Sequence, residues 1–233
     1  MIEFKVASLI NNPENGDLWQ GLNAASVALQ QVAQSETAVY QVFSEQLIKL
    51  DLHGSINLLD ETGENLRISS MVFSDRLTKL VNVVEKRINI KGQDFTYPVH
   101  GSPADALVLT QGDVVFLPDN SEKMRQVIPP RVMKYAATLL KPFFKLPAIL
   151  APIFIKAEVG GVLYVAGKKL RVEDVPAIAA FATHLSIALE NARLFQKVQQ
   201  AESQYRRLFE SANDGIFLFD RRTRQIISAN PKM

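Results

Sequence analysis

The stretch that decides the fold is residues 186–220, which read SIALENARLFQKVQQAESQYRRLFESANDGIFLFD. Apolar residues recur every three or four positions up to about Ser211, as on one face of a helix, and then alternate as in a strand, with no turn-rich linker between the two patterns. With the apolar positions before it, this spacing predicts one helix from Val175 to about Ser211, roughly 55 Å long at 1.5 Å per residue. Such a helix extends well beyond the domain in which it begins.

The outer half of this helix has the pattern of a weak coiled coil. Its apolar residues follow steps of four and three from Leu194 through Ala201 to Leu208, in a register that differs from that of the inner stripe. We therefore expect a parallel homodimer; the alternative is one amphipathic helix that folds back on its own domain. The residues expected on the dimer helix are Leu185, Ala188, Ala192, Phe195, Val198, Tyr205 and Leu208.

The composition is that of a folded protein without cysteine chemistry. With 233 residues, 47% of them apolar, the chain is long enough for one domain and a fragment of a second. Its 26 Lys and Arg residues and 24 Asp and Glu residues are spread along the chain, so we expect no nucleic-acid partner. No run approaches the roughly 18–20 uninterrupted apolar residues of a membrane span, and no export signal is visible, which leads us to expect a cytoplasmic location. The absence of cysteine excludes disulfides and thiolate nucleophiles.

The other elements predict an antiparallel sheet with helices on its faces. Two helices come before any strand, and paired glycines near the last hairpin suggest a turn there that needs positive backbone dihedrals or close approach. The expected elements are helices from 17 and after 35, a hairpin over about 54–70, a helix over 77–88, strands at 95–99 and 113–119, two short helices within 120–146, and a hairpin that turns at 158–161.

Three segments carry a family resemblance: LIKLDLHGSINLLDETGENLRIS, LPAILAPIFIKAEVGGVLYVAGKK and RVEDVPAIAAFATHLSIALENARLF. Together they resemble the GAF domain, a small-ligand and regulatory module common in bacterial signalling proteins, over roughly residues 20–196. QYRRLFESANDGIFLFDRRTRQIISANP, which follows, resembles the opening of a PAS domain. The resemblance implies an α+β fold made of an N-terminal segment (1–16), a GAF domain (17–196), a helical coiled-coil linker (197–211) and the truncated start of a PAS domain (212–233).

The resemblance also implies a role in signalling. In sensor histidine kinases and related proteins, a ligand- or partner-induced change passes through a dimeric helix to a downstream PAS and output domain. The alternative is a GAF unit that binds nothing and serves in dimerisation and spacing. We expect no enzyme, because GAF-like proteins that reduce methionine sulfoxide use cysteines, as does thioether attachment of a linear tetrapyrrole. The cyclic-nucleotide pattern is not matched either, since Glu173 and Asp174 stand in reverse order and suit a helix cap better.

Ligands of the family lie between the sheet and the helices and loops that follow the middle strands. A mostly apolar cavity at these positions would suit a small, flat or hydrophobic ligand, although large apolar residues there equally describe a filled core, which the sequence slightly favours. No cofactor is identified, and no histidine pair has metal-ligand spacing; haem ligation by His100 is the one exception that the resemblance leaves open. The candidate ligand-binding residues are Phe95, Tyr97, His100, Phe116, Tyr135 and Phe143.

The last two strands have an unusual property. IFLFD and QIISAN, without the rest of a PAS sheet, would expose an unpaired edge and an apolar face. We expect a second copy of the chain to cover them.

Overall fold

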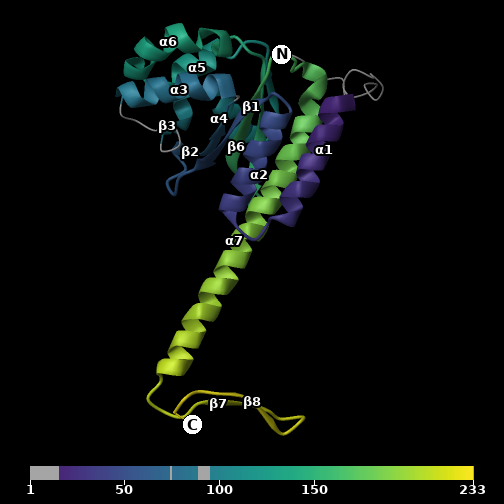
Figure 1. Ribbon diagram of the computed structural model, residues 1–233, viewed down its shortest axis with the longest axis vertical. Coiled ribbons are helices and arrows are strands. Elements are labelled where there is room, and N and C mark those ends of the chain that lie inside the picture. Colours follow the sequence, from purple (N-terminus) through teal and green to yellow (C-terminus); the bar gives the residue numbers. More distant parts are fainter. Residues whose placement is uncertain (1–15, 74, 89–94, 233) are drawn as a thin grey trace.

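Figure 1 shows the computed structural model, which describes residues 16–73, 75–88 and 95–232. Six strands form a sheet in the order β3-β2-β1-β6-β5-β4, and every neighbouring pair is antiparallel. The predicted α+β class is therefore confirmed. The strands are β1 (His53–Leu59), β2 (Asn65–Val72), β3 (Thr96–Pro98), β4 (Val115–Leu117), β5 (Ala148–Ile155) and β6 (Glu158–Ala166).

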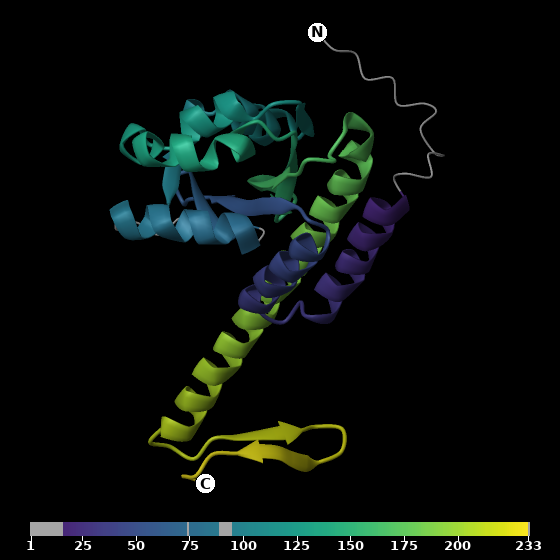
Figure 2. The ribbon, with the colours of Figure 1, turned by 45° about the horizontal axis from the view of Figure 1, so that its top comes forward.

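Helices cover both faces of this sheet (Figures 1 and 2). One face carries α1 (Gly16–Gln31), α2 (Glu36–Lys49) and the first half of α7 (Val175–Ser211). The other face carries α3 (Asp75–Ile88), α4 (Pro103–Gln111), α5 (Ser121–Val127) and α6 (Pro130–Phe144). Short 3-10 turns at Val99–Gly101 and Val172–Asp174 lead into α4 and α7.

Strand alternation divides the interior between the two faces of the sheet, because successive side chains point to opposite faces. The larger core lies between the sheet and α1, α2 and α7, and a smaller one lies under α4. In β1 and β6, Ile56, Leu58, Leu163 and Val165 face the larger core, whereas Ser55, Asn57, Val162 and Tyr164 face the other side.

Helix α7 has the predicted extent, Val175–Ser211, and contains 37 residues. Its side chains are buried at regular intervals as far as Ala192, and beyond that point the helix leaves the domain (Figure 1). By length and composition it could span a membrane, but half of its most apolar 18-residue window is buried inside the domain. That burial is what a helix in a protein core requires.

The structure corrects the prediction for the inner stripe of the dimer helix. Leu185, Ala188 and Ala192 are fully buried in the core of their own chain, so they are not available to a second copy. The seam prediction therefore narrows to the outer residues, which are 39% to 72% exposed: Phe195, Val198, Tyr205 and Leu208.

The turn between β5 and β6 also differs from the prediction. Lys156 and Ala157 form it, with φ of 52° and 65°, whereas Gly160 and Gly161 lie within β6. Gly161 serves close approach instead: a Cβ atom there would lie 2.5 Å from the carbonyl oxygen of Asn57 in β1. Only glycine lets the two backbones meet at this distance.

This contact predicts the effect of replacing Gly161. We expect Gly161→Ala to lower the free energy of unfolding by about 1–3 kcal/mol, because β1 must shift away from β6 to admit the methyl group. Urea denaturation followed by circular dichroism measures the change. Gly101→Ala is the matched control, since its methyl group would meet only Pro98 at 3.4 Å; an equal loss in both variants would contradict the close-approach explanation.

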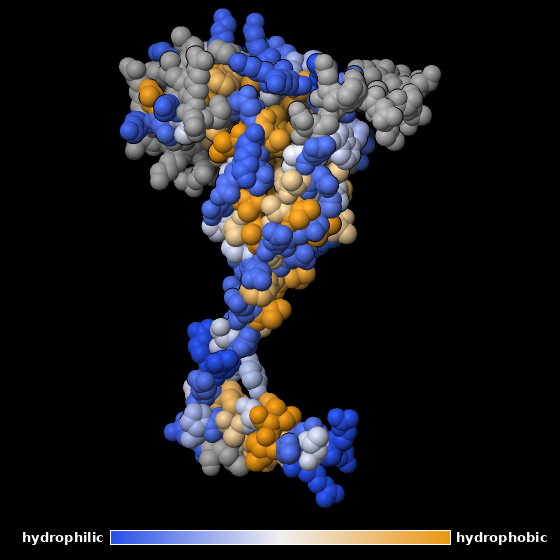
Figure 3. Space-filling view, turned by 45° about the vertical axis from the view of Figure 1, so that its right-hand side comes forward, coloured by the Kyte–Doolittle hydropathy of each residue, from blue (hydrophilic) through white to orange (hydrophobic). Residues whose placement is uncertain are grey.

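Beyond α7, β7 (Phe217–Asp220) and β8 (Gln225–Ala229) pair as an antiparallel hairpin. Asn230 closes its base by accepting the N–H of Ile216 at 2.8 Å and donating to the carbonyl of Asp214 at 2.9 Å. Apolar side chains gather on its surface (Figure 3), and Phe217, Phe219, Ile226 and Ile227 are 48% to 69% exposed. The hairpin thus exposes the apolar face that the sequence predicts.

Candidate ligand site

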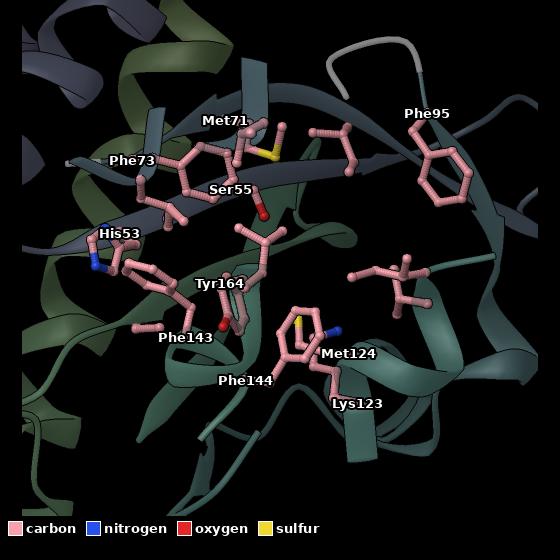
Figure 4. A pocket seen from close by; sticks show the side chains of 18 of the residues that line it. His53, Ser55, Met71, Phe73, Phe95, Lys123, Met124, Phe143, Phe144 and Tyr164 are labelled. Carbon is pink, nitrogen blue, oxygen red and sulfur yellow. The ribbon is translucent and has the colours of Figure 1, made fainter. Parts of the chain in front are cut away.

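A cavity of about 200 Å³ lies between the sheet and helices α3, α5 and α6 (Figure 4). Strands β1, β2 and β6 form its floor, and most side chains around it are apolar. Much of the apolar lining comes from Met71, Phe73, Leu77, Met124, Phe143 and Phe144.

The floor of the cavity carries its hydrogen-bonding groups. Because β1 directs every second residue toward the cavity, His53, Ser55 and Asn57 line it together. Ser55 is paired in register with Tyr164 of β6, and both side chains extend from the sheet into the same space (Figure 4). Asn57 donates from Nδ2 to the carbonyl of Val162 at 3.2 Å, and its buried Oδ1 has no partner within the described residues.

A buried ion pair stands at one side of the cavity. Lys123, in α5 and 5% exposed, donates from Nζ to Asp105 of α4, which is fully buried. The hydroxyl of Tyr97 also donates to Asp105, at 3.3 Å. The ammonium lies 5.7 Å and 5.8 Å from the ring centroids of Tyr97 and Tyr164, within the range of cation–π attraction.

Burial shifts the titration of these groups toward their neutral forms. Desolvation lowers the pKa of Lys123, and the Asp105 carboxylate opposes that shift. Desolvation raises the pKa of Tyr97 and that of Tyr164, and nearby Asp105 raises both further. Burial also lowers the pKa of His53, whose ring meets Phe143 edge-on at 5.3 Å. Burial thus favours the uncharged form of His53, whereas the Asp105 carboxylate favours the charged form of Lys123.

Comparisons with known proteins address the fold. One solved structure with a similar fold is that of a methyl-accepting chemotaxis protein, residues 122 to 287. The two share 18% sequence identity with a TM-score of 0.51, and the match covers 75% of this chain and 99% of that one. Another similar structure is the GAF domain of nlh2 from A. aeolicus in an inactive state, with 17% identity and a TM-score of 0.50; the match covers 78% of this chain and 99% of that one. The domain has the GAF fold. A free methionine-R-sulfoxide reductase from Neisseria meningitidis, in complex with its substrate, also has a similar fold. It shares 11% identity with a TM-score of 0.51, and the match covers 83% of this chain and 98% of that one.

Sequence comparisons add one finding. The family model of a PAS domain matches residues 203–233, the end of α7 together with the β7–β8 hairpin. No curated protein matched the sequence. One helix thus joins the GAF fold to a segment that matches the PAS family.

Of the six side chains predicted for the cavity of the GAF domain, the structure describes five, and three of these line it. Phe95, Tyr97 and Phe143 line it. His100 is exposed in the turn before α4 and lies outside the lining, and Phe116 packs against the core on the opposite face of the sheet. Tyr135 belongs to α6, but its side chain lies outside the described part.

Sequence reasoning missed the polar part of the site: Ser55, Asn57, Tyr164 and Lys123. The alternation in HGSINLL was the available clue, since it places polar residues on one face of a strand expected to be buried.

The structure also bears on two other kinds of site considered from the sequence, the acidic pair at Glu173 and Asp174 and a metal site. Asp174 accepts the N–H of Arg171 at 2.8 Å and thereby closes the 3-10 turn that leads into α7. Within the residues that the structure describes, no group of three His, Asp or Glu side chains is arranged to hold a metal ion.

Proposed function

We propose that this GAF domain is the sensory input module of a cytoplasmic signalling protein. A ligand- or partner-induced change in the domain passes through a dimeric α7 to a downstream PAS domain and an output domain. The observation that carries this proposal is the continuity of α7, which begins in the GAF core and ends in the segment that matches the PAS family. The fold shared with a chemotaxis protein supports the same role.

The sheet provides a physical connection between the cavity and α7. In β6, Tyr164 faces the cavity, whereas its neighbours Leu163 and Val165 belong to the core that includes α7. In β5, the N–H of Phe154 donates to the Ser186 hydroxyl of α7 at 3.0 Å. Because protein interiors are close-packed, a ligand that displaces the floor of the cavity also changes how the sheet packs against α7.

The outer half of α7 provides the surface for a second copy. Leu194, Val198, Tyr205 and Leu208 are 50% to 72% exposed and lie at coiled-coil spacing. Pairing two such helices in parallel would remove these side chains from water, and the short seam makes the pairing weak enough to respond to the domain. The exposed face of the β7–β8 hairpin would be covered by the same partner.

Cysteine cross-linking tests this arrangement without background, because the chain contains no cysteine. We expect Val198→Cys and Leu208→Cys to form disulfide-linked dimers readily, since side chains at a parallel seam come within bonding range. Ser203→Cys, placed about 140° around the helix from Val198, is the matched control and should stay monomeric. Equal cross-linking at all three positions, or none at any, would contradict a parallel seam.

The same variants test transmission of a signal. Cross-linking rates are compared between protein as purified and protein refolded without its small molecules. If the domain is a sensor, the cross-linking rate at Val198 or Leu208 changes when the cavity is emptied. If it is a spacer that binds no ligand, both rates stay the same.

A further inference from the structure

We propose that the cavity selects an uncharged ligand, about the size of one substituted aromatic ring, that has both a hydrogen-bond donor and an acceptor. This inference names the ligand class of the site and rests on the sensory function proposed above. Size, charge and hydrogen bonding each contribute a separate argument.

The volume sets the size of the ligand. Pockets for drug-sized molecules enclose about 300–1,000 Å³, whereas an apolar cavity of about 150 Å³ in another protein holds one benzene. At about 200 Å³, this cavity fits a single ring with a small substituent. A nucleotide or a tetrapyrrole is too large for it.

The charges set the ionic state of the ligand. Lys123 is the one lysine or arginine in the described lining, and Asp105 already neutralises it. An anionic ligand would therefore bring an unbalanced negative charge into an apolar space, next to the Asp105 carboxylate. A cation would meet Lys123 without a carboxylate in the described lining to receive it. Burying an unbalanced charge is costly, so neutral molecules are favoured.

Hydrogen-bonding groups on the floor set the polarity. The hydroxyls of Ser55 and Tyr164 line the cavity with no hydrogen bond inside the described structure, and each can donate or accept. A ligand with both a donor and an acceptor can accept from one of these hydroxyls and donate to the other, whereas one that lacks the donor can only accept.

Three probes of nearly equal shape separate these properties: benzamide is neutral with a donor and an acceptor, acetophenone lacks the donor, and benzoate is charged. Titrations followed by amide chemical shifts in β1 and β6 measure their dissociation constants. We expect benzamide to bind about 3- to 10-fold more tightly than acetophenone and at least about 10-fold more tightly than benzoate. Benzoate binding as tightly as benzamide, or no binding by any probe, would overturn the proposal.

Removing the hydroxyls of Ser55 and Tyr164 tests whether the floor of the cavity causes the preference for benzamide over acetophenone. Ser55→Ala/Tyr164→Phe removes two groups without partners, so the fold should persist, as a dispersed amide spectrum would verify. Its preference for benzamide over acetophenone should fall to less than about 2-fold, while Ser203→Ala/Tyr205→Phe, which removes the same atoms from outer α7, keeps the wild-type preference. A preference that survives in the cavity variant contradicts the assignment. The sensory function fails separately, if emptying the cavity leaves α7 cross-linking unchanged.

Discussion

Replacing Asp105 with alanine should lower the free energy of unfolding by about 3–5 kcal/mol, because it leaves the Lys123 ammonium buried and unpaired. The two side chains are 0% and 5% exposed, and Asp105 also accepts from Tyr97, so losing the carboxylate removes the partner of both Lys123 and Tyr97. Urea denaturation measures the loss. The control is Asp105→Leu/Lys123→Met, which removes both charges and should recover most of the stability.

The pH dependence of the same variant has a defined sign. Burial lowers the pKa of Lys123 in the folded protein, and Asp105→Ala removes the carboxylate that opposes this shift. The unfolded chain keeps a lysine pKa of about 10.4, so between the lowered pKa and that value it binds more protons than the folded chain. Stability therefore rises with pH across this window, more steeply in the variant than in the wild type. A variant with wild-type stability and slope would show that the pair is not buried.

A second large effect is expected at Phe181 in the inner half of α7. Phe181 is 1% exposed and stacks on Phe43 of α2 with ring centroids 6.3 Å apart. Phe181→Ala should lower the free energy of unfolding by about 3–5 kcal/mol, the usual cost of an emptied aromatic site in a core. Thermal or urea unfolding at several protein concentrations measures it.

Leu208→Ala is the matched control on the same helix, since Leu208 is 72% exposed. Its domain stability should stay within about 0.5 kcal/mol of wild type, while its concentration-dependent association weakens. Equal destabilisation by both substitutions would mean that the outer half of α7 belongs to the domain core, and would contradict the division of α7 into a core half and a pairing half.

Local pattern was sufficient for the elements with sustained periodicity. Helix α7 was predicted at its observed bounds, because regular apolar spacing continues from Val175 to Ser211. Helix α4 was missed, because Gly101, Ser102 and Pro103 read as a turn and the nine residues of the helix have no clear apolar face. The glycine pair was misplaced for a related reason: sequence cannot distinguish a glycine needed for its dihedrals from one needed for close approach.

The residues of the candidate site likewise divide into those that local sequence predicts and those that it does not. Aromatic character was enough to predict Phe95, Tyr97 and Phe143 near a pocket, because large apolar side chains gather between layers. Lys123 and Asp105 were not predictable, since they are 18 residues apart on different helices and charged residues are usually exposed. Their burial follows from how α4 and α5 pack together, which a single sequence does not display. The inner residues of α7 were assigned to a dimer for a similar reason, because a stripe buried within one chain has the same spacing as an intersubunit seam.

Native mass spectrometry of the protein as purified from cells tests the pairing of α7 and the sensory role together, because one spectrum reports subunit number and retained small molecules. We expect a homodimer that carries an additional non-covalent mass of a small, uncharged organic molecule. A dimer without added mass would favour the ligand-free spacer. A monomer without added mass, at micromolar concentration and low ionic strength, would contradict both the pairing of α7 and the sensory role.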